Sequence, residues 1–298
     1  MTAEGRSVAL GAYFGSASHP RRLGHYTRLI GRPPAIVGSY VQWRLAPFQR
    51  QRLARIWESG ALPLVTWEPW TSAARPFPLR QIAAGRYDAY VHRAARAAAR
   101  WGQPILLRFA QEMNGGWYPW GREHVGAHAY KAAWRHLVRV FRAEGARNVR
   151  WVWTPYVNSD GRFPFKGLYP GDRWVDWVGL DGFNWGTARG KWQWFGQVFG
   201  SSYRILARIS SRPMIIAETG SSEAGGSKPR WVRRALRWEI PRMDRIRALV
   251  WFDEPFNGID VRVNSSAASL RALRWAMRAP TYRSGRDAVI RATAHLHF

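Results

Sequence analysis

Eight short apolar runs recur along the chain, and each is followed by a longer stretch whose apolar residues repeat at helical spacing. The runs cover residues 8–14, 35–40, 62–67, 104–109, 149–154, 177–183, 213–219 and 247–253. Short apolar runs bounded by turn residues are typical of buried strands, and their alternation with helices is typical of a parallel sheet. Eight such units predict a closed (β/α)8 barrel, in which functional residues lie at the carboxyl ends of the strands.

The stretches between the runs have one apolar and one basic face. Over residues 83–100, Tyr87 and Val91 recur at helical spacing, and Arg86 and Arg93 recur on the other side. Two further helices are predicted, one around residues 130–142 and one over residues 228–239 that ends before a proline. Each of these helices is expected to pack its apolar face on the barrel.

The chain has 298 residues, a length that one barrel of this kind commonly reaches. We predict a single barrel domain over residues 1–279 and a C-terminal extension, residues 280–298, packed on it. No apolar run approaches the ~18 residues that a membrane span needs. The first residues lack the pattern of a signal peptide, so the localisation stays open, and we expect a monomer.

The chain is strongly basic, with 46 Lys and Arg against 19 Asp and Glu and a formal net charge of +27. Such a field attracts nucleic acid, anionic membrane surface or acidic polysaccharide. The arginines are spread over many helices and form no single stripe, which favours a basic coating without a specific partner, and no nucleic-acid partner is predicted. The absence of Cys excludes disulfides, thiolate catalysis and Cys-ligated zinc.

The segment from Arg108 to Gly121 reads RFAQEMNGGWYPWG and begins at the end of the fourth predicted strand. It carries one carboxylate, Glu112, with amide side chains nearby at Gln111 and Asn114. Its aromatic side chains are Trp117, Tyr118 and Trp120. A site that cleaves carbohydrate needs a proton donor, hydrogen bonds for hydroxyls and flat rings for the apolar faces of sugars. The alternative interpretation is a strand-to-helix loop with buried tryptophans.

A second carboxylate, Glu218, ends the seventh predicted strand in the sequence IIAETGSSE. Strands four and seven lie on opposite sides of an eight-stranded ring, so Glu112 and Glu218 are expected to face each other across its mouth. Two facing carboxylates can hydrolyse a glycosidic bond, because one protonates the leaving oxygen and the other attacks the anomeric carbon or activates water. An ion pair between Glu218 and an arginine is the alternative. Other polar strand ends are Glu68, Tyr156, Asp181, Asp253 and Glu254.

Four segments are distinctive together: RFAQEMNGGWYPW (residues 108–120), YPGD (169–172), VDWVGLDGFNW (175–185) and IAETG (216–220). They resemble glycoside hydrolase family 26, and the resemblance extends over nearly the whole chain. It implies a retaining endo-β-glycanase on a (β/α)8 barrel that needs no cofactor. Most of the resembling enzymes act on β-1,4-mannan, and some act on mixed-linkage β-1,3-1,4-glucan or β-1,3-xylan. The resemblance also implies an extracellular location.

Carried onto this chain, the resemblance implies that Glu112 is the acid/base and Glu218 the nucleophile. It implies that Arg108 and Asn114 orient these groups. The implied sugar platforms are Trp117, Trp185 and Trp251. Further candidate substrate contacts are Gln111, Trp120, Tyr156, Asp181, Phe183, Trp67 and Glu68. No metal site is predicted, since no third ligand accompanies the two histidines at positions 124 and 128.

Two positions depart from the family pattern. The resembling mannanases typically carry His before the acid/base, where this chain has Gln111, and Tyr near the nucleophile, where it has Phe183. Mannose and glucose differ only in the hydroxyl at carbon two, and an amide offers that hydroxyl a different donor and acceptor set from an imidazole. Gln111 therefore predicts mixed-linkage β-1,3-1,4-glucan as the first substrate and β-1,4-mannan as the second. The rival hypothesis is a catalytically weak polysaccharide-binding barrel, including one for acidic exopolysaccharide.

Overall fold

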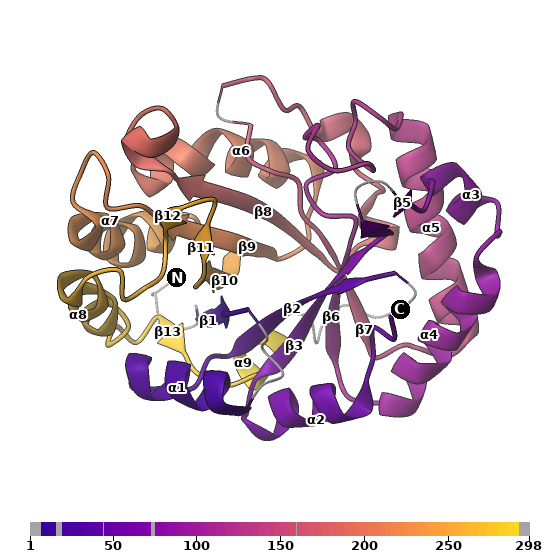
Figure 1. Cartoon of the computed structure of the whole chain (residues 1–298), viewed down its shortest axis with the longest axis horizontal. Coiled ribbons are helices and arrows are strands. Elements are labelled where there is room, and N and C mark those ends of the chain that lie inside the picture. The colour runs from indigo at the N-terminus through magenta and orange to yellow at the C-terminus, as the bar shows by residue number, and fades with distance from the viewer. Residues whose placement is uncertain (1–6, 16–19, 44, 73–74, 159, 292–298) are drawn as a thin grey trace.

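The structure is a computed structural model that describes residues 7–15, 20–43, 45–72, 75–158 and 160–291. Its central sheet closes into a parallel barrel, because the first barrel strand pairs with both the second and the eighth barrel strand (Figure 1). The barrel strands are β1 (Val8–Tyr13), β2 (Ile36–Gln42), β3 (Leu62–Glu68), β6 (Ile105–Phe109), β7 (Val149–Trp153), β8 (Trp177–Asn184), β9 (Met214–Ser221) and β10 (Ile246–Phe252). Each predicted apolar run forms one of these strands, so the predicted (β/α)8 barrel is confirmed.

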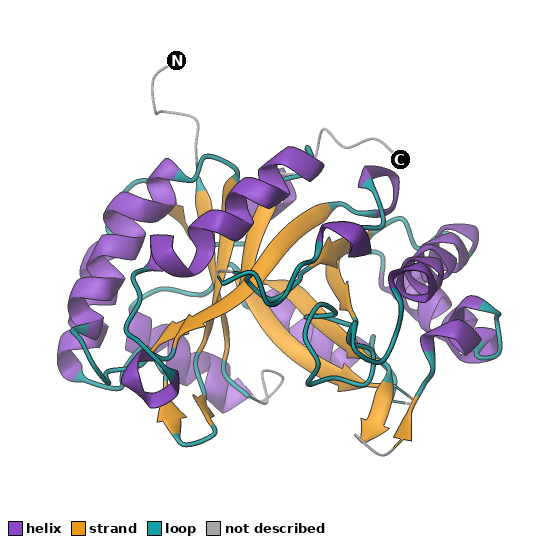
Figure 2. Cartoon of the chain, turned by 90° about the horizontal axis from the view of Figure 1, so that it is seen from above, coloured by secondary structure: helices purple, strands orange, loops and turns teal. Residues whose placement is uncertain are grey.

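Helices surround the barrel on its outside, as Figure 2 shows. They are α1 (Pro20–Ile30), α2 (Arg50–Glu58), α3 (Leu79–Ala83), α4 (Asp88–Trp101), α5 (Ala127–Ala143), α6 (Phe195–Ile209), α7 (Lys228–Arg234), α8 (Ala267–Ala276) and α9 (Asp287–Arg291). The predicted helix over 83–100 begins later than expected, because the chain turns at Gly85 with a φ of 81° before α4 starts. The predicted helix over 228–239 continues past α7 as a π-helical turn, η5 (Ala235–Glu239). No helix in the described part of the chain is long and apolar enough to cross a membrane.

The loops between the barrel strands and helices contain short strands and 3-10 turns. Two small hairpins follow barrel strands, β4 (Trp70–Ser72) with β5 (Arg75–Pro76) after β3, and β11 (Pro255–Phe256) with β12 (Ile259–Asp260) after β10. The remaining 3-10 turns are η2 (Lys166–Leu168), η3 (Asp172–Trp174), η4 (Gly186–Arg189) and η6 (Ile240–Arg242).

The barrel interior changes from apolar to polar along its axis. Successive side chains of a strand point to opposite faces, so residues two apart share a face. On β3 the buried face that begins with Leu62 and Leu64 continues to Thr66 and Glu68 at the carboxyl end. On β6 the residue two positions after Leu106 is Arg108. The carboxyl ends of the strands therefore gather buried polar side chains.

The segment after position 279 packs on the amino end of the barrel. Its short strand β13 (Tyr282–Arg283) pairs in parallel with β1, and the Tyr282 hydroxyl donates to the Leu236 carbonyl. Helix α9 also contacts β1. Residues 292–298 of the predicted extension lie outside the described residues. The boundary at residue 279 stays a prediction.

Candidate active site

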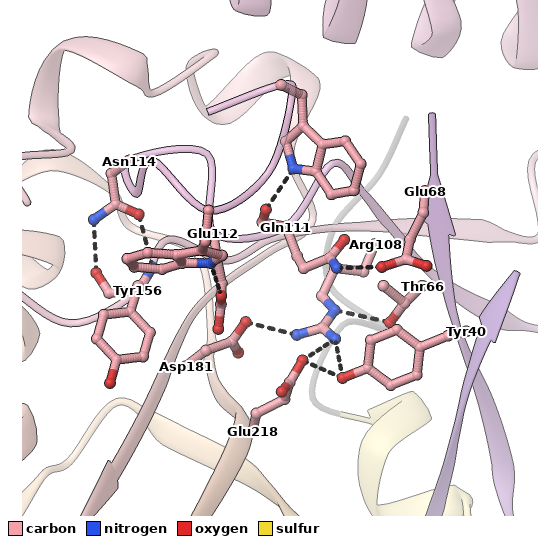
Figure 3. A network of polar contacts seen from close by, with 12 residues as sticks. Tyr40, Thr66, Glu68, Arg108, Gln111, Glu112, Asn114, Tyr156, Asp181 and Glu218 are labelled. Atoms are coloured by element: carbon pink, nitrogen blue, oxygen red, sulfur yellow. Dashed lines mark hydrogen bonds and ion pairs between the residues drawn. The ribbon is translucent and has the colours of Figure 1, made fainter. Parts of the chain in front are cut away.

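Arg108 is the centre of a buried polar network at the carboxyl ends of the strands (Figure 3). Its side chain is 1% exposed, and its Nη1 donates to Asp181 Oδ2 at 2.8 Å. Its Nη2 donates to Glu218 Oε1, and its Nε donates to Thr66 Oγ1 at 3.0 Å. A guanidinium offers a rigid planar fork of donors, so these bonds define the positions of both carboxylates. Strands β3, β6, β8 and β9 are thus linked through one side chain.

Glu112 reaches this network from a strained loop directly after β6. The backbone φ of Glu112 is 52° and that of Ala110 is 46°, and residues other than Gly rarely adopt such positive values. The Glu112 amide donates to the Thr154 carbonyl at 2.9 Å, which holds the turn against the end of β7. Strain of this kind is concentrated at functional sites, where the surrounding structure maintains it. Here it directs a carboxyl group toward Glu218 across the mouth (Figure 3).

The carboxyl groups lie close together and are shielded from water. One carboxylate oxygen from each of Glu112, Asp181 and Glu218 lies within 4.8 Å of the others. Burial and the nearby charge of Glu218 raise the pKa of Glu112 to about 8. The Trp117 indole donates to Glu112 Oε2 at 2.5 Å and opposes that shift. Glu112 therefore holds its proton at neutral pH and can donate it, and Arg108 pairs with both Asp181 and Glu218.

Tyr40 belongs to the site, although the sequence analysis did not select it. Its hydroxyl donates to Glu218 Oε1 and accepts a hydrogen bond from Arg108 Nη2 at 3.2 Å. Phe183 has no hydroxyl, but Glu218 still has a phenol partner, because strand β2 supplies Tyr40. Its position in the sequence could have indicated this role, since Tyr40 is the last residue of the second apolar run and so lies near the carboxyl end of a strand.

Gln111 and Glu68 form a buried pair beside the carboxyl groups. Gln111 is 0% exposed, and its Nε2 donates to Glu68 Oε1 at 2.9 Å. The Trp70 indole donates to the other oxygen of Glu68 at 3.2 Å. Burial raises the pKa of Glu68, and these two hydrogen bonds oppose that rise. Within the described residues Gln111 Oε1 is buried and has no hydrogen-bond partner.

Aromatic side chains line one side of the mouth. Trp117 is 45% exposed, and its ring meets the edge of Tyr156 at a centroid distance of 5.1 Å. Trp185 stacks on Phe183 at 4.4 Å, and its indole donates to the Tyr156 hydroxyl at 3.2 Å. Trp117, Tyr156, Trp185 and Phe183 are thus brought together, as a carbohydrate site requires.

Three predicted substrate contacts lie in the core instead. Trp67, Trp120 and Trp251 are 0%, 2% and 3% exposed, so none presents a ring face to a ligand. Trp67 stacks on the core residue Trp43 at 4.9 Å. The Trp120 indole donates to the Gln111 carbonyl and the Trp251 indole to the Val261 carbonyl, so these side chains support loops. The prediction of a sugar platform at Trp251 does not fit this burial.

Asn114 joins two loops of the site. Its Nδ2 donates to the carbonyls of Tyr156 and Phe163, both at 2.8 Å, and its Oδ1 accepts from the Tyr156 amide at 2.8 Å. Its three described hydrogen bonds join the loop after β6 to the loop after β7, and none reaches a carboxyl group. Asn114 therefore holds the loop that carries Glu112 against the backbone of Tyr156 and Phe163, and among the described contacts it reaches neither Glu112 nor Glu218 directly.

The rim carboxylates are committed elsewhere. Glu254 pairs with Arg22 at 2.7 Å, and Asp253 Oδ1 accepts the Val263 amide at 2.6 Å. The described residues contain one cluster of acidic side chains whose oxygens lie close enough together to hold a cation. It consists of Glu112, Asp181 and Glu218. Arg108 already pairs with two of these three, which favours acid and nucleophile chemistry over metal binding.

The chain is similar to carbohydrate-active proteins. The glycosyl hydrolase family 26 model matches residues 86–218. Endoglucanase H of Acetivibrio thermocellus is 36% identical over 281 residues, which are 91% of this chain and 30% of that protein. A mannan endo-1,4-beta-mannosidase of Bacillus subtilis (strain 168) is 27% identical over 185 residues, 59% of this chain and 45% of that protein. The chain thus spans less than half the length of these two relatives.

Solved structures share the fold at low sequence identity. The catalytic domain of a Bacillus sp. JAMB-750 endo-beta-1,4-mannanase superposes with a TM-score of 0.72 at 17% identity, over 95% of this chain and 88% of that one. A Cellulomonas fimi endo-beta-1,4-mannanase superposes with a TM-score of 0.70 at 16% identity, over 96% of this chain and 74% of that one. At such identities the likeness concerns the fold alone.

Proposed function

Because this chain belongs to glycoside hydrolase family 26, we propose that it hydrolyses β-linked polysaccharide at internal bonds. The observation that carries the proposal is the approach of Glu112 and Glu218, with one oxygen of each within 4.8 Å, in a mouth lined by tryptophan and tyrosine. A buried acid with a raised pKa beside a second carboxylate is the pair that glycoside hydrolysis requires. The names of the relatives, endoglucanase and endo-mannosidase, support internal cleavage of β-glycans.

The proposed mechanism is double displacement with retention at the anomeric carbon. Retaining enzymes hold their carboxyl groups about 5 to 5.5 Å apart, whereas inverting enzymes leave about 6.5 to 9.5 Å for a water molecule. One oxygen of Glu112 lies within 4.8 Å of one oxygen of Glu218, and this close approach supports the retaining class. In the first step Glu112 gives its proton to the leaving oxygen while Glu218 forms an ester bond to the anomeric carbon. In the second step Glu112 takes a proton from water, whose oxygen displaces Glu218.

The hydrogen bonds of Glu218 indicate which of its oxygens attacks. Arg108 and Tyr40 both donate to Oε1, whereas Oε2 has no hydrogen bond from any described residue. A lone pair engaged by two donors is a weaker nucleophile than a free one. We therefore assign the attack to Oε2 and the anchoring of the side chain to Oε1.

A reducing-sugar assay with carboxylate variants tests the activity. Glu112→Ala and Glu218→Ala should each lose most turnover on β-glycan polymers. Added azide should restore turnover to Glu218→Ala and yield the product of inverted configuration, because azide replaces the missing nucleophile. Glu254→Gln is the matched control, since Glu254 pairs with Arg22 at the rim and should keep wild-type turnover. Wild-type turnover in either alanine variant would refute the assignment.

We propose mixed-linkage β-1,3-1,4-glucan as the preferred substrate and β-1,4-mannan as the second. Gln111, with its unpaired Oε1 and its bond to Glu68, supports this order, because it replaces an imidazole with an amide acceptor beside the acid. The relative that aligns over 91% of this chain is named an endoglucanase, which supports the same order. An unpaired polar group costs about 1 to 3 kcal/mol, which corresponds to up to about a hundredfold in specificity.

Comparing kcat/KM on barley β-glucan and on galactomannan tests the substrate order. The wild type should prefer β-glucan, and Gln111→His should move the ratio toward mannan. Glu68→Gln is the companion variant, because it weakens the partner of Gln111 without adding an imidazole. A wild type that already prefers mannan, with a ratio that Gln111→His leaves unchanged, would contradict the proposal.

The rival hypothesis of a catalytically weak binding barrel depended on Phe183, Gln111 and the large positive charge of the chain. Tyr40 provides the phenol that Phe183 lacks, and the raised pKa of Glu112, caused mainly by burial, provides an acid ready to donate. These observations support turnover over binding alone. The azide experiment also separates the two hypotheses, since a binding protein has no turnover to restore.

A further inference from the structure

Arg189 is an exposed cation on the aromatic side of the mouth. It ends η4, the turn that follows β8, and its Cζ lies 5.0 Å from the Trp185 ring centroid and 5.3 Å from that of Phe256. Among the described residues no side chain forms an ion pair or a hydrogen bond with its guanidinium. Its donors are therefore available to a ligand, and the two rings restrict the positions it can take.

The loop that carries Arg189 is held firmly. Asn184 Oδ1 accepts the amides of Gly186 at 3.2 Å and Gln193 at 2.9 Å, and Asn184 Nδ2 donates to Ser221 Oγ at 2.9 Å. Gly186 has a φ of 58°, and a Cβ there would lie 1.9 Å from the Ala224 carbonyl oxygen. The turn therefore requires glycine and has little room to shift, so the position of Arg189 is largely defined before a ligand binds.

A continuous series of contacts joins Arg189 to the acid. Glu112 accepts a hydrogen bond from Trp117, whose ring meets Tyr156, and the Tyr156 hydroxyl accepts a hydrogen bond from Trp185. Arg189 lies over Trp185 at the outer end of this series. The cation thus belongs to the wall of the proposed substrate site but is several side chains away from the bond that is cleaved.

The charges along this wall change from inside to outside. Among the described residues, Glu68, Glu112, Asp181 and Glu218 surround a single cation, Arg108, at the proposed cleavage point. A carboxylate on the sugar at that point would meet this acidic group and be disfavoured. At the outer end, Arg189 offers a planar fork of donors that matches a carboxylate. The site therefore favours an acidic group only on a sugar farther along the polymer.

We propose that Arg189 binds a carboxylate on a sugar farther along the chain than the two joined by the cleaved bond, so that the substrate class is a β-glucan backbone bearing acidic residues or acidic substituents. The inference rests on the proposed glycanase function and names the charge of its substrate. It also gives a use to the net charge of +27, which would draw such a polymer toward the protein at low salt. The sugar at the cleavage point itself stays neutral.

Two forms of one polymer test the inference. Barley β-glucan is compared with the same β-glucan partly oxidised at carbon six to glucuronate, and kcat/KM is measured on both at low salt. Arg189→Gln should reduce the ratio of kcat/KM on the oxidised polymer to that on the neutral polymer by about fivefold, the effect of a favourable exposed ion pair. Arg189→Lys should retain part of the preference. Arg204→Gln is the matched control, because it removes an exposed arginine from α6 on the outside of the barrel.

Salt gives a second readout that a purely structural role would not affect. At 1 M salt the screening length falls to about 3 Å, so the difference between wild type and Arg189→Gln should largely disappear. An unchanged ratio in Arg189→Gln, or an equal loss on both polymers, would overturn the inference and leave the glycanase function standing. A wild-type protein that hydrolyses neither polymer would instead overturn the proposed function on which the inference rests.

Discussion

Replacement of Tyr40 by Phe tests how the barrel holds its nucleophile. The change removes the hydroxyl that donates to Glu218 Oε1 and accepts from Arg108 Nη2 at 3.2 Å. The ring stays in place, so its edge contact with Tyr13 at 4.7 Å and the packing of β2 are retained. The variant therefore removes one hydrogen bond of the carboxylate and one of Arg108, and keeps the ring packing.

The loss should affect the two chemical steps differently. Glu218 is charged in the free enzyme, becomes a neutral ester in the first step and regains its charge in the second, so the Tyr40 donor stabilises the state that the second step restores. A hydrogen bond to a charged group contributes about 1.5 to 3 kcal/mol. If about half of that is present in the transition state of the second step, hydrolysis of the ester slows about four- to twelvefold. The first step does not lose rate for this reason, so the ester accumulates.

Rapid mixing with 4-nitrophenyl β-cellobioside measures both steps. For Tyr40→Phe we expect a burst of nitrophenol equal to the enzyme concentration, a lower steady-state kcat and a lower KM. Tyr13→Phe is the control, because the Tyr13 ring contacts Tyr40 but no described hydrogen bond joins its hydroxyl to Glu218. Equal slowing of both steps without a burst would mean that Tyr40 supports the fold around Glu218. An unchanged kcat would refute the reasoning entirely.

Three further predictions concern the acid and its loop. Burial raises the pKa of Glu112 to about 8, above its usual 4.5, so the folded state binds a proton more tightly than the unfolded state. The free energy of unfolding should therefore fall as pH rises from 4.5 to 8. Urea titrations at these two pH values should show the fall in wild type and not in Glu112→Gln. Trp117→Phe removes the indole donor that lowers the pKa of Glu112, so the loss of activity at high pH should move to higher pH while kcat/KM falls, as a pH profile would show. Asn114→Ala removes three hydrogen bonds and should lower the stability by about 2 to 3 kcal/mol in thermal or urea unfolding, and a wild-type midpoint would contradict this.

The sequence alone predicted the barrel and the acid and nucleophile candidates at its mouth. Apolar runs and helical periodicity are local signals, and each run became one barrel strand. Closure of those strands places their carboxyl ends at one mouth, so polar residues that end apolar runs are expected there. Arg108, Glu112 and Glu218 follow this rule, and the structure brings them together. Local pattern sufficed because the position along a strand determines which end of the barrel a residue occupies.

Only the tertiary structure decided which side chains face a ligand. The chain has 19 tryptophans, and the sequence could not tell the exposed ring of Trp117 from the buried rings of Trp67 and Trp251, because burial depends on the paths of distant loops and helices. The same holds for hydrogen-bond partners. Tyr40 reaches Glu218 across the barrel from a strand far away in the sequence, whereas Asn114, only two residues from Glu112, turns away to the loop after β7. Such pairings depend on how closure of the barrel brings distant strands together, which no local pattern records.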